Sequence, residues 1–195
     1  MVTTEQIKEL RDATGISIMQ CRKALEDTNG DMEKATIILR KKGADIASKK
    51  ADRSLNAGRI AAYVHSSGQA GAILELSCET DFVSKNEEFY ALAYDIAMQV
   101  VATKPEYLKM EDITEADREK AKEAFLPELE GKPEAMKEKI MAGKLDAYFG
   151  DKVLLEQPFI KNGDLKIKDL ISNCVQKFGE KTEIRRFTRF SVTDK

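Results

Sequence analysis

The sequence predicts an α+β fold, in which a bundle of three helices precedes a second part that combines a small antiparallel sheet with helices. Three observations favour this class. Apolar residues recur at helical spacing through the first part of the chain, the pattern changes to strand-like alternation after Gly58, and helical spacing returns at residue 87. We therefore expect two domains, a helical one over residues 1–54 and an α+β core over residues 55–195.

Cap signals define the first two helices of the bundle. Thr3 and Gln6 have the spacing of a capping box, and Gly15 suits a helix stop. Ser17 and Gln20 repeat the capping signature and predict the start of a second helix. The apolar side chains of this second helix follow each other at spacings of three and four residues: Ile18, Cys21 and Leu25.

A third helix and a basic connector complete the first domain. Asp31 is placed to cap the helix, and Gly43 predicts its end. The connector over 44–58 continues a stretch from Arg40 to Arg53 that contains six cations and two acids. Such a stretch is most typical of a solvated helix face, and the alternative is a patch that meets an acidic or phosphate-bearing partner. Three short helices with tight turns make a small unit that often serves as a docking module.

The core is predicted to begin with a β-hairpin. Residues 59–65 and 70–78 have strand patterns, and the Ser-Ser-Gly-Gln sequence at 66–69 is typical of a turn between them. Three apolar residues of the second strand are nearly continuous, as in a strand that is buried on both faces: Ile73, Leu74 and Leu76. Helical spacing over 87–103 then predicts a long helix, which Lys104-Pro105 ends.

The remainder of the core alternates between helical and strand patterns. Residues 105–139 contain eleven Asp or Glu against seven Lys or Arg, and we expect an exposed, acidic helical excursion there. Residues 153–159 and 182–192 are strand candidates, and residues 167–178 have the single apolar stripe of a helix. This mixture supports the α+β class for the second domain.

Composition excludes several classes of function. The 195 residues carry a formal net charge of -2, which gives no global field for holding nucleic acid, so we expect no direct nucleic-acid partner. No apolar run approaches the roughly 18 residues of a membrane span, and the N-terminus lacks the pattern of a signal peptide. We therefore expect a cytoplasmic protein without a membrane role.

Residues suited to covalent chemistry are few. The cysteines Cys21, Cys78 and Cys174 are far apart and form no CxxC pair, and the acidic neighbours of Cys78 would raise its pKa, so we expect it to be buried and structural. The single histidine, His65, has no Ser or Cys motif beside it and excludes a His-rich metal site. Phosphate-binding glycine motifs are absent. We expect no catalytic residue, no bound metal and no cofactor.

The most informative segment lies between the second strand and the long helix. Residues 79–89 read ETDFVSKNEEF. On one interpretation Thr80 or Asp81 caps a turn. Phe82 and Val83 would then plug the junction between sheet and helix. On the other interpretation the loop offers an acid beside a large aromatic side chain to a partner, as an interface anchor does.

A family resemblance favours the second interpretation. The Thr80-Asp81-Phe82-Val83 sequence, with Asn86 and Phe89 after it, is similar to the signature of the elongation factor Ts family. The resemblance extends, in the same order, over nearly the whole chain. Its other residues are Leu10-Arg11, Thr14-Gly15, Cys21, Lys23-Ala24-Leu25, Gly30-Asp31, Leu39-Arg40, Gly43, Ala47, Lys49-Lys50-Ala51, Gly58 and Gln157-Pro158-Phe159-Ile160.

The resemblance implies a nucleotide-exchange factor rather than an enzyme. Such a protein would bind the GDP-bound form of elongation factor Tu, the GTPase that delivers aminoacyl-tRNA, and promote GDP release. The first domain would be like a ubiquitin-associated (UBA) domain. The residues that press into the partner's nucleotide domain, near its Mg²⁺ and phosphate site, would be Thr80, Asp81, Phe82 and Val83. Those of the first domain that face the same nucleotide domain would be Lys8, Arg11, Ile18 and Met19.

The resemblance is to the short form of the family. Many members carry a duplicated core subdomain, whereas short members tend to pair as homodimers that rebuild the missing half. A small sheet with an open edge and an uncovered apolar face favours the same conclusion, so we expect a homodimer joined through the core. Gln99 stands where the family often has histidine. The alternative function is a UBA-like or ribosome-associated adaptor without exchange activity, which would use the first domain alone.

Overall fold

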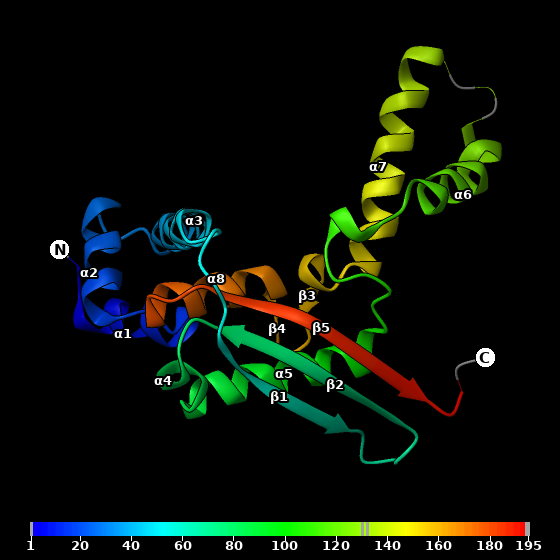
Figure 1. Cartoon of the computed structure of the whole chain (residues 1–195). Helices are drawn as coiled ribbons and strands as arrows, with labels where there is room; N and C mark the ends of the chain where they lie inside the picture. The colour runs from blue at the N-terminus through cyan, green and yellow to red at the C-terminus, as the bar shows by residue number, and fades with distance from the viewer. Residues whose placement is uncertain (1, 130, 132, 194–195) are drawn as a thin grey trace.

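The computed structural model has the predicted α+β architecture, with a helical bundle at one end of a small antiparallel sheet (Figure 1). It describes residues 2–129, 131 and 133–193. The bundle consists of α1 (Thr4–Thr14), α2 (Ile18–Asp27) and α3 (Met32–Lys49). The elements of the core are β1 (Ala57–Val64), β2 (Ala70–Cys78), α4 (Asp81–Ser84), α5 (Glu87–Thr103), α6 (Glu115–Phe125), α7 (Glu134–Lys152), β3 (Pro158–Phe159), β4 (Asn162–Lys166), α8 (Ile167–Phe178) and β5 (Thr182–Ser191). Short 3₁₀ turns lie at Met110–Asp112, Leu126–Leu129 and Leu154–Glu156.

Helix α1 is capped at both ends as the sequence predicts. The Gln6 N–H donates to the Thr3 hydroxyl at 3.2 Å, and the Thr3 N–H donates to the Gln6 side chain at 3.0 Å, which completes the capping box. Gly15 follows the helix in the left-handed conformation, with a φ of 70°. Ser17 occupies the N-cap of α2, but its side chain makes no cap hydrogen bond, so the second capping box, predicted from Ser17 and Gln20, is wrong.

A small hydrophobic core holds the bundle together. Its buried residues are Leu10, Ile16, Cys21, Ala24, Leu25, Ala35 and Leu39. Ile18 is the first residue of α2 and is 53% exposed, so it lies outside the apolar stripe that spacing predicts for this helix. The spacing rule identifies Cys21 and Leu25 correctly, but the end of the stripe depends on which residues the neighbouring helices reach.

Helix α3 is longer than predicted. The sequence places its end at Gly43, but the helix continues to Lys49 and packs against α8. A Cβ atom at Gly43 would lie 3.3 Å from both the backbone oxygen of Ser172 and the side-chain oxygen of Gln176. The glycine therefore permits close packing of two helices instead of ending one of them.

Three cations of the basic stretch join the bundle to the core. Arg40 and Lys50 donate to the carbonyl oxygens of Asp164 and Gly179, and Arg53 pairs with the carboxylate of Glu79. The stretch is therefore in part an internal contact, so the interpretation as a wholly solvated helix face is only partly right.

The main sheet is antiparallel throughout, in the order β1-β2-β5. Helix α5 packs on one of its faces (Figure 1), where Leu74 and Leu76 are fully buried. The opposite face is open, and Ile73 on that face is 48% exposed. The prediction that β2 is buried on both faces is therefore wrong for the single chain, because side chains alternate across a sheet and helix α5 covers one side.

The acidic excursion forms a hairpin of α6 and α7 that projects from the core (Figure 1). A cluster of its own holds it, with Ile113, Ala121, Phe149 and Val153 buried. The predicted excursion ends at residue 139, so most of helix α7 lies beyond it, and strand β4 is absent from the sequence prediction. The strand predicted over 153–159 is mostly wrong, because Leu154–Glu156 is a 3₁₀ turn and strand β3 is limited to Pro158–Phe159. Leu154 is buried by packing in the main core instead of by sheet pairing.

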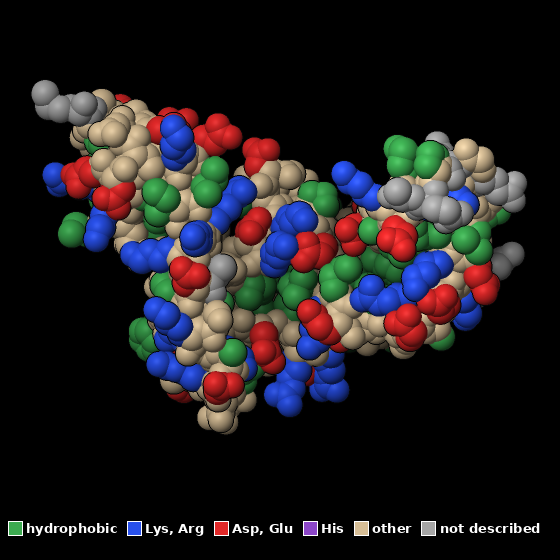
Figure 2. Space-filling model, turned by 90° about the horizontal axis from the view of Figure 1, so that it is seen from above, with side chains coloured by type: hydrophobic (Ala, Val, Ile, Leu, Met, Phe, Trp, Pro, Cys, Tyr) green, Lys and Arg blue, Asp and Glu red, His purple; other side chains and the backbone are tan. Residues whose placement is uncertain are grey.

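The surface carries charges of both signs. On the face seen in Figure 2, Lys and Arg side chains are interspersed with Asp and Glu side chains. This distribution agrees with the formal net charge of -2. In the described part of the chain, no helix combines the length and the apolar character that crossing a bilayer requires.

Candidate functional site

The segment between β2 and α5 forms a tight turn around the four-residue helix α4. Thr80 is its N-cap, with extended backbone angles φ -128° and ψ 159°. Val83 packs in the main core and is 2% exposed, whereas Phe82 is 79% exposed. Successive residues of a helical turn point in different directions. The prediction that both side chains plug the junction is therefore right for Val83 and wrong for Phe82, which projects into solvent.

Thr80 is tied to a distant part of the core. Its N–H donates to Oε2 of Glu180 at 3.0 Å, and its hydroxyl donates to Oε1 of the same carboxylate at 2.6 Å. The Cys78 thiol donates to the Thr80 carbonyl oxygen at 3.2 Å. Glu180 is a residue of this site that sequence reasoning misses, because 100 positions separate it from Thr80 and no local pattern connects the two.

Asp81 carries the negative charge of the turn. Its Oδ2 lies 2.5 Å from Nζ of Lys85, and both side chains are largely exposed. The hydrogen bond and the charge of Lys85 hold the pKa of Asp81 below its ordinary value, so the carboxylate is ionised at neutral pH. The turn thus presents an ionised carboxylate next to an aromatic ring.

The four candidate residues of the first domain are all exposed. Lys8 and Arg11 lie on α1, and neither forms an ion pair with a residue that the structure describes. Ile18 and Met19 begin α2 and are 53% and 77% exposed. Helices α1 and α4 lie at the same end of the molecule in Figure 1, and the end of α1, the start of α5 and helix α8 line a common groove. The structure therefore brings both sets of candidate residues to one end of the molecule.

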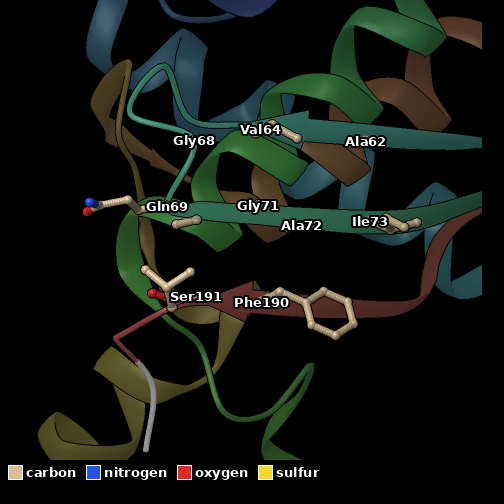
Figure 3. A pocket seen from close by; sticks show the side chains of 11 residues that line it. Ala62, Val64, Gly68, Gln69, Gly71, Ala72, Ile73, Phe190 and Ser191 are labelled. Carbon is tan, nitrogen blue, oxygen red and sulfur yellow. The ribbon is translucent and has the colours of Figure 1, made fainter.

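A second exposed apolar surface covers the side of the sheet opposite α5. Figure 3 shows side chains of all three strands around a hollow on this side, with Val64, Ile73 and Phe190 labelled. We call this surface the open sheet face, and its exposed apolar residues are Ile60, Val64, Ile73, Phe190 and Val192. They are between 48% and 74% exposed and belong to three neighbouring segments of the sheet, and the ion pair of Glu75 with Arg186 lies on the same face.

Gln99 is buried and makes three hydrogen bonds. Its Nε2 donates to Oε1 of Gln157 at 3.2 Å and to the carbonyl oxygen of Pro158 at 3.1 Å. Its Oε1 accepts from the Ile160 N–H at 2.9 Å. Because the side chain is 0% exposed, Gln99 holds the β3 segment against α5 and offers no surface to a partner.

The cysteines and the histidine have no arrangement suited to covalent catalysis among the described residues. All three thiols are buried, as the sequence predicts for Cys78, and burial raises the pKa of Cys78 to about 11 and that of Cys174 to about 12. His65 is exposed, and its Nδ1 lies 2.8 Å from the Ser67 hydroxyl. Within the described ranges, no cluster of three or more His, Cys, Asp or Glu residues is placed to hold a metal ion.

Comparisons with known proteins identify the family. The family model described as Elongation factor TS matches residues 5–194. The chain is 48% identical to elongation factor Ts of Carboxydothermus hydrogenoformans over 194 residues, which cover 98% of this chain and 89% of that protein. It is 50% identical to the protein of Thermodesulfovibrio yellowstonii and 48% identical to that of Thermotoga maritima, with 98% of this chain and 96% of each relative covered. The chain belongs to the elongation factor Ts family.

Membership of the elongation factor Ts family confirms the function predicted from the sequence. Elongation factor Ts is the nucleotide-exchange factor for elongation factor Tu. The comparisons give no support to the alternative, an adaptor without exchange activity. The matched residues cover 89% to 96% of these relatives, so the similarity extends over nearly their whole length.

Proposed function

We propose that this protein releases GDP by inserting the turn Thr80–Val83 beside the Mg²⁺ and phosphate site of elongation factor Tu. The observation that carries the proposal is the exposure of Phe82, at 79%, on a turn whose next residue is buried. A large aromatic side chain on a fixed backbone loses little conformational freedom when it binds, as an interface anchor requires. Full burial of such a ring contributes about 1.5–3 kcal/mol.

Asp81 supplies the electrostatic part of the mechanism. GDP is held by charge-assisted contacts to its phosphates and by the Mg²⁺ ion, and a carboxylate placed beside them weakens both. Nucleotide and exchange factor must lower each other's affinity by the same factor, because the two binding equilibria are linked. GDP therefore leaves when the factor binds, and the factor is displaced when GTP enters.

The first domain is proposed to dock on the same nucleotide domain. The charges of Lys8 and Arg11 are not used in ion pairs with described residues, and Ile18 and Met19 expose apolar surface at the start of α2. The buried cluster of the bundle is separate from that of the core, which supports a division into a docking domain at 1–54 and an α+β core at 55–195.

The proposed mechanism makes no covalent bond and needs no cofactor. The buried thiols with raised pKa values are poor nucleophiles, which supports the assignment as a non-enzyme. We place the protein in the cytoplasm, with neither nucleic acid nor membrane as a direct partner. The interspersed surface charge in Figure 2 supports the absence of a nucleic-acid partner, since phosphate backbones are bound by clustered cations.

We also propose that two copies of the chain pair through the open sheet face. Several exposed apolar side chains on one sheet face usually mark an interaction site, and a two-fold partner covers them with the same surface. Such pairing would bury Ile73 and so account for the nearly continuous apolar pattern of β2. The candidate turn follows Cys78 at one end of β2, whereas the exposed Val64 and Phe190 pair with Gly71 near its other end, so the dimer leaves the turn accessible.

Release of fluorescent GDP from elongation factor Tu tests the role of the turn. Phe82→Ala should slow the stimulated release about tenfold or more, which is the scale of an interface hot spot. Its circular dichroism should match that of the wild type, because Phe82 does not pack in the core. Leu126→Ala is the matched control, since it removes another apolar side chain, 56% exposed, from the α6–α7 hairpin. If Phe82→Ala stimulated GDP release at the wild-type rate, the turn would not be the active element.

A further inference from the structure

Two pairs of neighbouring residues join the turn to the segment between α8 and β5. Thr80 donates twice to the Glu180 carboxylate, from its N–H at 3.0 Å and from its hydroxyl at 2.6 Å. In the reverse direction, the Lys181 N–H donates to Oε1 of Glu79 at 2.5 Å. We call Glu79, Thr80, Glu180 and Lys181 the clamp. The Glu79 carboxylate, at the end of β2, thus binds the backbone just before β5. The Glu180 carboxylate, just before β5, binds the backbone at the end of β2.

The segment that carries Glu180 is fixed on both sides. Gly179 follows α8 in the left-handed conformation, with a φ of 70°, and its N–H donates to the Val175 carbonyl oxygen at 2.9 Å. Thr182 begins β5, is buried, and pairs with Cys78 of β2. The backbone of Glu180 is therefore held between a helix end and a strand start, so its carboxylate has a defined position.

The clamp replaces the usual cap of α4. An N-cap threonine ordinarily accepts a hydrogen bond from its own helix, but the Thr80 side chain accepts none there and is directed at Glu180. A four-residue helix is too short to hold its own conformation in water. The direction in which α4 presents Phe82 is therefore set from outside the turn.

We propose that Glu180 is a positioning residue for nucleotide exchange, which fixes Thr80 and thereby aims Phe82 at the nucleotide site of elongation factor Tu. The inference rests on the proposed function of the turn and extends it to a residue 100 positions away. Hydrogen bonds to a carboxylate are roughly twice as strong as those between neutral groups. Removal of this carboxylate therefore loosens α4 more than loss of an ordinary surface contact.

The clamp also reaches the connector that follows the bundle. Arg53 donates to Oε2 of Glu79 at 2.9 Å, and Nζ of Lys181 donates to the Ala51 carbonyl oxygen at 2.6 Å. The Lys181 N–H and then Arg53 hold the pKa of Glu79 below its ordinary value, so the carboxylate stays ionised. The clamp therefore fixes the turn relative to the docking domain, and both can engage the GTPase in one encounter.

Two measurements on the full chain test this role. The first is hydrogen exchange of the backbone amides of residues 80–84, made without the GTPase. The second is the rate of GDP release from elongation factor Tu at increasing concentrations of the factor, which separates the maximal rate from the half-saturating concentration. The variants are Glu180→Ala, Glu180→Gln and Thr80→Val. Glu106→Ala is the control, because the Glu106 carboxylate also accepts a hydrogen bond, from Nζ of Lys152 at 2.7 Å, but lies at the base of the hairpin.

Glu180→Ala should speed amide exchange across the turn and lower the maximal release rate about tenfold, as expected when two charge-assisted hydrogen bonds are lost. The half-saturating concentration should stay within about twofold, because the docking domain is unchanged and carries its share of the binding. Glu180→Gln keeps one oxygen for the Thr80 hydroxyl and should give an intermediate rate. Thr80→Val with Glu180→Ala should cost less than the sum of the two single changes, because both remove the same contact.

Other results would overturn the proposal in distinguishable ways. Wild-type release by Glu180→Ala, with slowed release by Phe82→Ala, would remove the positioning role and leave the proposed function intact. If Glu180→Ala instead raised the half-saturating concentration and lowered the melting temperature, Glu180 would be a residue that contributes to overall stability and not a positioning residue. If Phe82→Ala itself has no effect, the proposed function fails. Amide exchange then decides separately whether Glu180 fixes the turn, and unchanged exchange overturns the clamp.

Discussion

The turn at Thr80–Val83 and the open sheet face both expose apolar side chains, but they differ in extent and in rigidity. The turn presents one ring, that of Phe82, beside an ion pair and on a backbone that Glu180 holds in place. The open sheet face spreads its apolar side chains over three strands. A small rigid anchor suits a contact that is made and broken in every cycle, whereas a broad apolar area suits a lasting partner. Exposure alone therefore does not determine what a surface does.

Removal of both surfaces has the largest expected effect. A fragment of residues 1–54 keeps the four exposed docking residues and the buried cluster of the bundle, so it should give the circular dichroism of a helical unit. It should not accelerate GDP release, because it lacks the turn, and it should remain a monomer, because it lacks the sheet. Exchange activity equal to that of the full chain would contradict both the domain division and the role of Phe82.

A charged substitution in the open sheet face should abolish dimerisation and leave nucleotide exchange unchanged. The wild type should show about twice the chain mass by light scattering at micromolar concentration. Ile73→Asp should show the mass of one chain, because it places an unpaired charge inside an apolar interface. GDP release per chain should stay close to that of the wild type, since the turn is untouched. Leu126→Asp on the hairpin serves as the control and should remain dimeric.

A wild-type protein that is strictly monomeric at that concentration and fully active would refute the dimer. The assignment of the turn would survive, since it depends on Phe82 and not on the open sheet face.

A substitution of the buried Gln99, which belongs to neither the turn nor the open sheet face, should alter only the stability of the protein. Gln99→Ala leaves the Ile160 N–H and the Pro158 carbonyl without their partner, which should lower the free energy of unfolding by about 1–3 kcal/mol. Gln69→Ala, at the exposed turn between β1 and β2, should change it by less than about 0.5 kcal/mol. Urea unfolding measures both values, and equal midpoints for the two variants would show that the Gln99 hydrogen bonds contribute little.

The smallest expected effect concerns the thiols, which belong to neither surface. With the pKa of Cys78 raised to about 11, thiolate is outnumbered about a thousandfold by thiol at pH 8, and burial blocks access as well. A thiol-specific chromogenic reagent should therefore react slowly with the native protein and rapidly with three thiols after denaturation. Rapid reaction of one thiol in the native state would show that the structure opens around it.

The elements that the sequence predicts correctly are those with local signals. The helices predicted at 87–103 and 167–178 match α5 and α8, because each has an apolar stripe and a defined stop. The capping box at Thr3 is likewise a contact between residues close in the chain. Helix α7 gives a weaker signal, since Gly143 and Gly150 interrupt it and glycine disfavours helix.

The features that the sequence does not predict depend on contacts between distant segments. Gly43 reads as a helix stop until the packing of α3 on α8 is known. In the candidate site, the residue pattern leaves the buried and the exposed interpretation of Phe82 open, and only the family resemblance favours the exposed one. Glu180 carries no signal of its own, because its role arises from the pairing of β2 with β5, which places it beside Thr80.

The α6–α7 hairpin leaves the core and returns to it at one point. The chain departs at Tyr107 and Leu108 and comes back at Leu154 and Leu155, whose N–H groups donate to the two departing carbonyl oxygens at 2.9 and 3.1 Å. The hairpin is therefore an insertion, because the chain leaves and re-enters the core at neighbouring positions. The entropy of closing such a loop changes only slowly with its length. A variant with a longer or shorter α6–α7 hairpin, or with a short linker in its place, should therefore keep the same path of the sheet. A circular permutant opened within this excursion would keep the N-terminal bundle, the turn and the sheet on one continuous chain.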